Sequence, residues 1–229
     1  MSHEHDLRTE VIRIAQRTYR AGLVAATDGN LSVRLTRDTF LITPSGSCLG
    51  ELEAEELVRI DRAGDPLPGD RGKPSSERRM HLAVYDARPD VHAVLHAHPP
   101  ITLGFSIAGE SLAGCVIPEV VVGLGTIPTT EYATPTTQAT ADMVGRAILR
   151  RDALILDRHG TVTVAATLTE AFHKLDKVEH TAKITLAARQ LGRVRHLPPE
   201  EVSKLLGMRE KLGLPPIVPH CNQCGICPG

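Results

Sequence analysis

The chain has 229 residues, a hydrophobic content of 41% and a formal net charge of −1 at pH 7. This length suits one large domain or two small ones, and the hydrophobic fraction is enough for a real core. The near-zero charge argues against the basic surface typical of nucleic-acid-binding proteins, and no apolar run reaches the roughly 20 residues that cross a bilayer. The segment over residues 1–10 is polar and lacks the apolar region of a signal peptide, so we expect a cytoplasmic protein.

Hydrophobic periodicity and turn residues predict short strands interspersed with helices. In chain order, we expect a helix over 6–21, a strand over 31–35, a strand over 39–43, a helical turn over 52–55, a strand over 57–61, a helix over 75–88, a strand over 91–98, a helix over 100–107, short strands and turns over 116–135, a helix over 136–151, strands over 153–157 and 161–166, and helices over 167–191 and 198–212. The many short strands joined by turns favour an α/β fold with an antiparallel-rich sheet. No repeat or linker divides the chain, so we expect one domain over 1–214 and a cysteine-rich tail over 215–229.

The strongest chemical signal is a pair of histidines near the end of a predicted buried strand, VHAVLHAHP over residues 91–99. Side chains alternate along a strand, so His96 and His98 point to the same face, with Cα atoms roughly 6.5–7 Å apart. Two imidazoles at that spacing can bind one metal ion, and a catalytic metal usually has three protein ligands. The best third candidate is His159 in the turn of LDRHG, although a histidine in such a turn is often only a turn residue.

Polar residues upstream of this pair form a second group. Glu77 is a candidate acid/base, and His81, in the predicted helix over 75–88, faces either this site or the sheet. Three polar turns, at 29–32, 43–46 and 74–77, expose backbone N–H groups and short hydroxyls that suit phosphate oxygens. Each turn is weak evidence alone, since turns are generally rich in Gly, Ser, Asn and Pro.

The segments GNLSVR, LITPSG, KPSSERRMHLAVY, RPDVHAVLHAHPP, YATP and LDRHG occur in this order. Together they resemble the class II aldolase/adducin-head family over about residues 7–190, and within it the L-fuculose-1-phosphate aldolases. The resemblance implies a single three-layer α/β/α domain around an antiparallel-rich central sheet. It also implies a homotetramer with active sites between subunits.

The same resemblance implies roles for individual residues. One Zn²⁺ per chain, or another divalent metal, is expected at His96, His98 and His159. Glu77 matches the acid/base carboxylate of the family. The implied pocket for the substrate phosphate consists of Asn30, Ser45, Gly46, Ser75 and Ser76.

These parts indicate a zinc-dependent aldolase that reversibly cleaves a ketose 1-phosphate to dihydroxyacetone phosphate and a short aldehyde. The metal would act as a Lewis acid on substrate oxygens. Glu77 would move the proton at the carbon that becomes nucleophilic, while the phosphate pocket orients the substrate. Glutamate at position 77 favours aldolases and related decarboxylases or dehydratases over ribulose-phosphate 4-epimerases, which typically carry aspartate there.

One position departs from the family pattern. Ile117 stands where fuculose-phosphate aldolases carry a tyrosine that protonates the aldehyde oxygen, and isoleucine transfers no proton. Glu119, a candidate second catalytic residue, and Tyr132 are possible substitutes. The alternative function is a metal-dependent decarboxylase or dehydratase of a phosphorylated sugar acid or ketose, and a decarboxylase needs no such donor. A non-catalytic adducin-like interaction module is disfavoured because the expected metal ligands are present.

The predicted tail carries a further motif. Cys221, Cys224 and Cys227 have the spacing C-x₂-C-x₂-C, with His220 adjacent. This spacing resembles part of a zinc or iron–sulfur site, so a second metal or cluster is a hypothesis beside that of a reduced tail. A disulfide is disfavoured in the cytoplasm.

Overall fold

The computed structural model describes residues 3–70 and 72–214. The tail hypothesis, which involves His220, Cys221, Cys224 and Cys227, lies outside the described residues.

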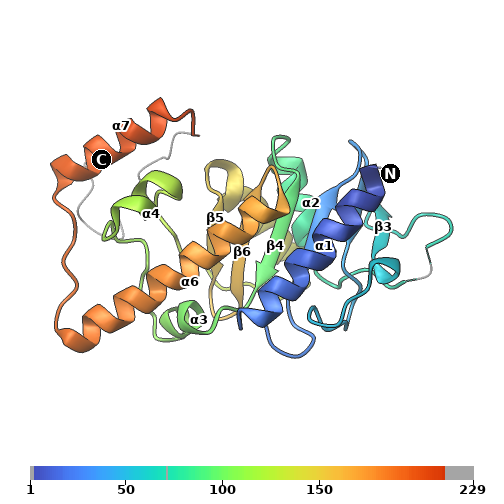
Figure 1. The fold of residues 1–229 in the computed structure, drawn as a ribbon, viewed down its shortest axis with the longest axis horizontal. Coiled ribbons are helices and arrows are strands. Elements are labelled where there is room, and N and C mark those ends of the chain that lie inside the picture. The colour runs from blue at the N-terminus through green and yellow to red at the C-terminus, as the bar shows by residue number, and fades with distance from the viewer. Residues whose placement is uncertain (1–2, 71, 215–229) are drawn as a thin grey trace.

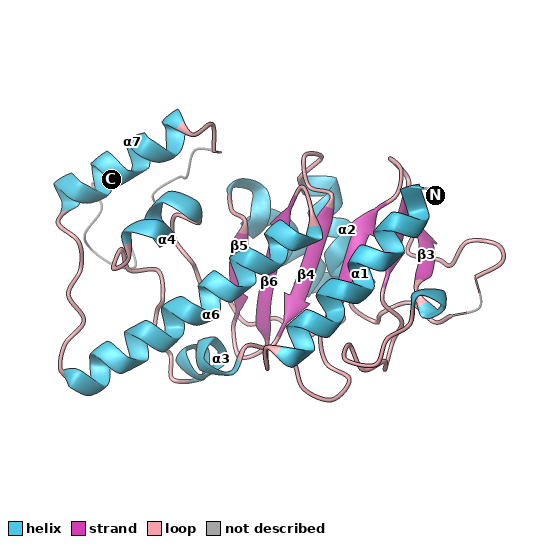
Figure 2. Ribbon diagram, in the orientation of Figure 1, coloured by secondary structure: helices cyan, strands magenta, loops and turns pink. Residues whose placement is uncertain are grey.

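A six-stranded sheet with the order β3-β2-β1-β4-β6-β5 forms the centre of the described part of the chain (Figure 2). Its strands are β1 (Asn30–Arg34), β2 (Thr39–Ile42), β3 (Val58–Asp61), β4 (Ala93–Ala97), β5 (Ala153–Leu156) and β6 (Gly160–Ala165). All neighbouring strands of this sheet pair antiparallel. The predicted antiparallel-rich α/β fold is therefore confirmed.

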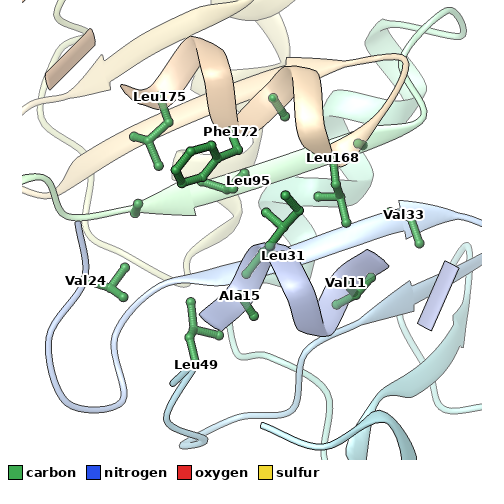
Figure 3. Packing of buried hydrophobic residues seen from close by; sticks show 14 of the residues in the cluster. Val11, Ala15, Val24, Leu31, Val33, Leu49, Leu95, Leu168, Phe172 and Leu175 are labelled. Atoms are coloured by element: carbon green, nitrogen blue, oxygen red, sulfur yellow. The ribbon is translucent and has the colours of Figure 1, made fainter. Parts of the chain in front are cut away.

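Two helices cover one face of the sheet, where α1 and α6 lie side by side (Figure 1). Helix α1 spans His3–Arg20, and α6 spans Leu168–Leu191. Thr167 begins α6 as its N-cap by accepting a hydrogen bond from the backbone N–H of Glu170, a common start signal. Val11, Leu31, Leu95, Leu168 and Phe172 are among the side chains that fill the space between these helices and the sheet (Figure 3).

The opposite face is covered by α2 (Arg78–Ala87) and α5 (Gln138–Ala147), which completes three layers. Strand alternation divides the side chains between the two faces: Leu95 packs with α1 and α6, whereas Val94 packs in the cluster of α2 and α5. The same parity places the odd-numbered residues of β1 toward α1, and leaves its even-numbered polar residues facing α2. Polar side chains at this interface must therefore bond one another.

The region over residues 116–135 is where the predicted elements differ most from the structure. Instead of short strands, the segment Pro118–Gly123 is the helix α4. Proline suits the first turn of a helix, and this outweighs the strand preference of the valines that follow. The helix points two neighbouring valines at different partners: Val121 packs with Val202 of α7 (Pro199–Lys211), and Val120 packs in the apolar cluster under α3 (Pro100–Ile107) and α6.

Smaller differences occur elsewhere. The predicted helix over 136–151 is α5 followed by a separate 3₁₀ turn, Ile148–Arg150, and the predicted turn over 52–55 is the 3₁₀ turn Ala54–Glu56. Helix α3 (Pro100–Ile107) directly follows the strand with the histidines. Its first N–H groups, at Ile101 and Thr102, donate to the carboxylate of Glu179, which is 1% exposed. No described helix is long and apolar enough to span a membrane.

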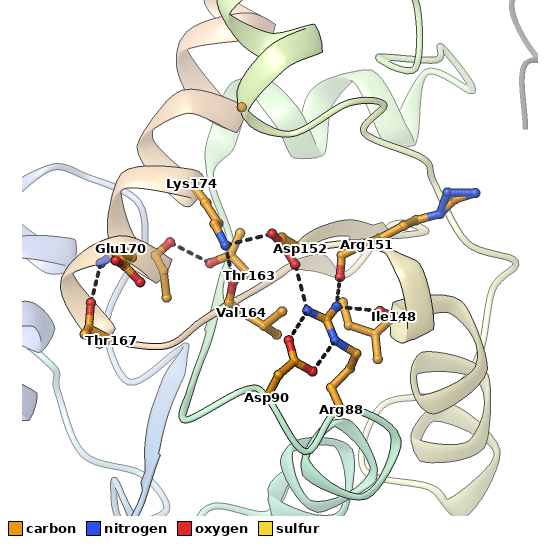
Figure 4. A network of polar contacts seen from close by, with 12 residues as sticks. Arg88, Asp90, Ile148, Arg151, Asp152, Thr163, Val164, Thr167, Glu170 and Lys174 are labelled. Atoms are coloured by element: carbon orange, nitrogen blue, oxygen red, sulfur yellow. Dashed lines mark hydrogen bonds and ion pairs between the residues drawn. The ribbon is translucent and has the colours of Figure 1, made fainter. Parts of the chain in front are cut away.

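A buried charged network ties the sheet to both helical layers at the start of β4 (Figure 4). Arg88 makes two hydrogen bonds to Asp90, at 2.8 and 2.7 Å, and lies 3.2 Å from Asp152. Lys174 of α6 donates to the same Asp152 at 2.9 Å and to the carbonyl oxygen of Val164 at 2.8 Å. His96 and His98 lie at the other end of β4. This network therefore stabilises the packing of the helices on the sheet and does not position the histidines directly.

Replacing Arg88 by alanine should destabilise the protein by about 3 kcal/mol, because it leaves Asp152 buried with one partner fewer. Asp90→Asn is the matched control, since the Asp90 side chain is 61% exposed and such a pair contributes about 0–1 kcal/mol. Urea unfolding of the three proteins measures both. Equal losses for the two variants would contradict the role given to the buried part of the network.

Candidate active site

Three histidines from two segments of the chain converge at one end of the sheet. His96 is in β4, His98 follows the strand end at Ala97, and His159 lies in the turn between β5 and β6. One ring nitrogen of each lies within 4.8 Å of those of the other two. The ring centroids are between 4.7 and 5.3 Å apart. The structure therefore brings together the three predicted metal ligands.

Contacts on the outer sides of the rings orient their nitrogens. Nδ1 of His96 lies 2.9 Å from the carbonyl oxygen of Thr161, so Nδ1 carries a proton and Nε2 faces the cluster. Nδ1 of His98 lies 3.5 Å from the carboxylate of Asp28, and its Nε2 is 3.0 Å from Nε2 of His96. Two lone pairs this close repel each other unless a proton or a cation lies between them. Three convergent imidazoles suit Zn²⁺ and related divalent metals, so the residues fit such an ion.

Glu77 lies against this cluster at the N-cap position of α2. Its Oε2 atom is 3.2 Å from Nε2 of His96, and its Oε1 atom is 3.3 Å from Nε2 of His159. Asn30 of β1 donates from Nδ2 to Oε2 at 2.8 Å. Among the described residues, Oε1 has no hydrogen-bond partner although it is buried. The carboxylate is thus held through Oε2 by Asn30 and presents Oε1 to His159.

The electrostatics of the cluster depend on this carboxylate. Burial raises the pKa of Glu77, but the charge of His96, the close approach of the His159 and His96 rings and the hydrogen bond from Asn30 outweigh it and lower the pKa well below its usual value. Burial lowers the pKa of His96, yet Glu77 outweighs burial and the net shift is upward. The pKa of His98 falls to about 4, because of burial and its two histidine neighbours. A carboxylate that stays ionised beside imidazoles can act as a base toward a bound substrate.

The predicted phosphate turns lie together beside Glu77. Pro44 and Pro74 form an isolated antiparallel bridge, which pairs the turn at 43–46 with that at 74–77. Ser45, Gly46 and Ser76 are exposed, whereas Ser75 is buried and its Oγ accepts a hydrogen bond from the backbone N–H of Glu77. Asn30, the fifth predicted member, is 5% exposed and its side-chain amide bonds Glu77.

Among the described contacts, none joins Ile117, Glu119 or Tyr132 to the three histidines. Ile117 is the N-cap residue of α4 and packs with the apolar cluster under α3 and α6. Glu119 is exposed on α4, and its backbone oxygen accepts a bond from Lys177. None of the described contacts of Glu77 involves Glu119. Tyr132 is exposed, with the guanidinium of Arg158, the residue before His159, 5.0 Å from its ring centroid.

Comparison with known proteins assigns the family. The model of the Class II Aldolase and Adducin N-terminal domain matches residues 9–186. The chain belongs to the class II aldolase and adducin family. The expected resemblance is thereby confirmed, and the chain is an enzyme of the class II aldolase superfamily.

Similar proteins of this family carry two different activities. The 3-oxo-tetronate 4-phosphate decarboxylase of Pectobacterium atrosepticum is 30% identical over 211 residues, which cover 90% of this chain and 94% of that protein. The L-fuculose phosphate aldolase of Methanococcus vannielii is 36% identical over 175 residues, which cover 76% and 93%. A solved L-fuculose 1-phosphate aldolase superposes with a TM-score of 0.82 at 30% identity, covering 93% of this chain and 98% of its own.

The structure shows which way His81 of α2 faces, a question that the sequence left open. His81 is 1% exposed and packs toward the sheet, where its Nε2 lies 2.6 Å from Oδ1 of Asn30 and its Nδ1 lies 2.7 Å from Oγ of Ser32. Burial and the charge of His96 lower its pKa to about 3. Helical spacing alone did not decide which way this side chain faces.

Gly160 is a further site residue that the sequence analysis missed. A Cβ atom at this position would meet the carbonyl oxygen of Ala97, and would lie 2.6 Å from Cδ2 of His98 and 3.1 Å from Cε1 of His96. Glycine therefore lets the β5–β6 turn, with His159, approach β4 closely. A glycine directly before the predicted strand over 161–166 is the signal that could have indicated such an approach.

Gly160→Ala should cost about 1–3 kcal/mol of stability and lower the metal content of the purified protein, because the added methyl group displaces His98 or the turn. Gly104→Ala in α3 is the control, since nothing lies within 4 Å of a Cβ there. Thermal unfolding and metal analysis report the two effects. Full metal content in the Gly160 variant would show that the close approach is not needed.

Burial of His81 should lower the stability of the metal-free protein as the pH falls from 7 to 5. The pKa of His81 is about 3 when folded and about 6.5 when unfolded, so in this window only the unfolded state takes up the proton. The native state therefore loses about 2 kcal/mol relative to the unfolded state from this residue. His81→Gln should remove that part of the slope, as measured by urea unfolding at each pH. An unchanged slope would show that His81 is protonated in the folded protein.

Proposed function

We propose that His96, His98 and His159 hold one divalent metal ion, with Zn²⁺ as the first candidate, and that Glu77 is the acid/base. The convergent nitrogens, the 3.0 Å approach of two Nε2 atoms and the family support this. The ion would supply a Lewis acid that stabilises negative charge developing on substrate oxygens. Ser45, Gly46, Ser75 and Ser76 would bind the substrate phosphate, with the helix N-terminus at α2 adding a favourable dipole.

We infer that the reaction is the decarboxylation of a 3-oxo sugar acid phosphate to dihydroxyacetone phosphate. Ile117 is the observation that carries this inference, because an isoleucine cannot transfer the proton that an aldehyde oxygen requires. In a decarboxylation the bond between the carboxylate carbon and C2 of the sugar acid breaks. CO₂ leaves, and the electron pair of that bond stays on C2. Glu77, which takes a proton from solvent in each turnover, delivers it to that carbon. The 3-oxo-tetronate 4-phosphate decarboxylase relative supports the same reaction.

Aldol cleavage of a ketose 1-phosphate is the second candidate, and the 36% identity to an L-fuculose phosphate aldolase favours it. Both reactions generate the same carbanion equivalent of dihydroxyacetone phosphate, so they use the same half of the site. The aldolase needs a further proton donor. Tyr132 beside Arg158, or Glu119, from this chain or a neighbouring copy, is the candidate for that role.

The proposed setting is a cytoplasmic homotetramer with active sites between subunits. The exposed position of Tyr132 and Glu119, which have no described contact with the histidines of their own chain, suits an active site that a second copy completes. The catalytic domain would comprise residues 1–214, and residues 215–229 would form a separate tail.

Three substrates test these reactions on the zinc-loaded protein. We expect CO₂ release from 3-oxo-tetronate 4-phosphate, hydrogen exchange of dihydroxyacetone phosphate in D₂O, and no condensation of the latter with short aldehydes. Glu77→Gln should lower turnover by about 10²–10⁴, and both chelation and His96→Ala should abolish activity with loss of about one bound metal per chain.

Condensation with an aldehyde, without release of CO₂, would overturn the decarboxylase proposal in favour of an aldolase. Activity that survives chelation and His96→Ala would overturn the metal site itself.

A further inference from the structure

A chain of buried hydrogen bonds runs from Glu77 into the layer between α2 and the sheet. Asn30 Nδ2 donates to Glu77 Oε2 at 2.8 Å, and Asn30 Oδ1 lies 2.6 Å from Nε2 of His81. Nδ1 of His81 lies 2.7 Å from Oγ of Ser32, which lies 2.8 Å from the hydroxyl of Tyr85. All five side chains are buried, with exposed fractions of 9% or less.

The chemistry of each group determines the direction of this chain. A carboxylate only accepts hydrogen bonds, so Asn30 must turn its NH₂ group toward Glu77 and its oxygen toward His81. That oxygen needs a donor, so Nε2 of His81 carries the proton and Nδ1 keeps a lone pair. Ser32 then donates to Nδ1 and accepts from Tyr85. Burial keeps the pKa of His81 low and raises that of Tyr85, so both remain neutral, as this direction requires.

The chain makes the two oxygens of Glu77 different. Oε2 accepts from Asn30 and lies beside Nε2 of His96. Oε1 is buried near His159 but has no hydrogen-bond partner within residues 3–70 and 72–214. Burying a carboxylate oxygen without a hydrogen-bond partner costs free energy. In a functional site, such an atom commonly finds its partner in a bound ligand.

We propose that His81 is a positioning residue which, as a neutral Nε2–H imidazole, orients the Asn30 amide so that Oε2 of Glu77 is anchored and Oε1 exchanges the proton with the substrate. This rests on the proposed acid/base role of Glu77. With the proton on Nδ1 instead, Nε2 and Oδ1 would repel, and Asn30 would rotate its oxygen toward the carboxylate. Both nitrogens of His81 are occupied by protein partners, which separates it from the three histidines of the metal site.

The tautomer of His81 is tested first, in the metal-free protein. Long-range ¹H–¹⁵N spectra of ¹⁵N-histidine-labelled protein, assigned by the signals missing in His81→Gln, should show a neutral ring with the proton on Nε2 at pH 7. A proton on Nδ1, or a charged ring, would overturn the proposal whatever the enzyme's substrate is.

Kinetics test the consequence for Glu77. In zinc-loaded protein, His81→Leu, which has neither donor nor acceptor, should lower kcat for hydrogen exchange of dihydroxyacetone phosphate about 10–100-fold, the usual effect of a lost outer partner. KM should change less than about threefold, because binding groups are untouched. His81→Gln, which keeps an N–H donor, should recover most of kcat. Thr163→Val is the control, since it removes a buried hydrogen bond to Ala171 that lies outside the chain.

The outcomes separate this proposal from the proposed function. Exchange by the wild type with an equal rate in His81→Leu, or an equal loss in Thr163→Val, would overturn the positioning role while leaving the function intact. No exchange by the wild type would instead refute the acid/base role of Glu77, and the tautomer would still show whether the chain has the inferred direction.

Discussion

The buried carboxylate of Glu77 is the interaction on which the rest of the site depends. It is the acceptor toward which Asn30 and the rings of His96 and His159 are turned. An ionised group with little exposure to water is stable only when donors and positive charge surround it. The direction of the hydrogen bonds behind it and the upward shift of the His96 pKa both follow from that requirement.

The fold supplies this arrangement by antiparallel pairing. The central strand β4 lies between β1 and β6, so Asn30 and His96 become neighbours on one face and the turn with His159 comes to the same end. Gly160 removes the side chain that would keep this turn away. At the other end of β4 the network around Arg88 joins the sheet to both helical layers. A site assembled from separate segments needs such a framework, since small displacements of catalytic groups are costly to the rate.

The two candidate reactions share one half of their chemistry and differ in the other. A metal ion, a phosphate pocket and a carboxylate suffice to form and protonate the carbanion equivalent of dihydroxyacetone phosphate. Release of CO₂ requires no further proton transfer from the protein, whereas release of an aldehyde requires a second proton transfer. The isoleucine at position 117 therefore bears on the leaving group and not on the carbanion.

Local rules in the sequence determined much of this protein. Turn residues and periodicity predicted the strands and most helices, and alternation alone put His96 and His98 on one face. The valines after Pro118 show the limit, because tertiary packing of Val121 against α7 and of Val120 in the cluster under α3 and α6 accompanies a helix where their strand preference predicted a strand. Whether His159 joins the pair, which way His81 faces and which oxygen of Glu77 is free were decided only by tertiary structure. Such contacts depend on the register between strands far apart in the chain, and short-range patterns carry no information about that register.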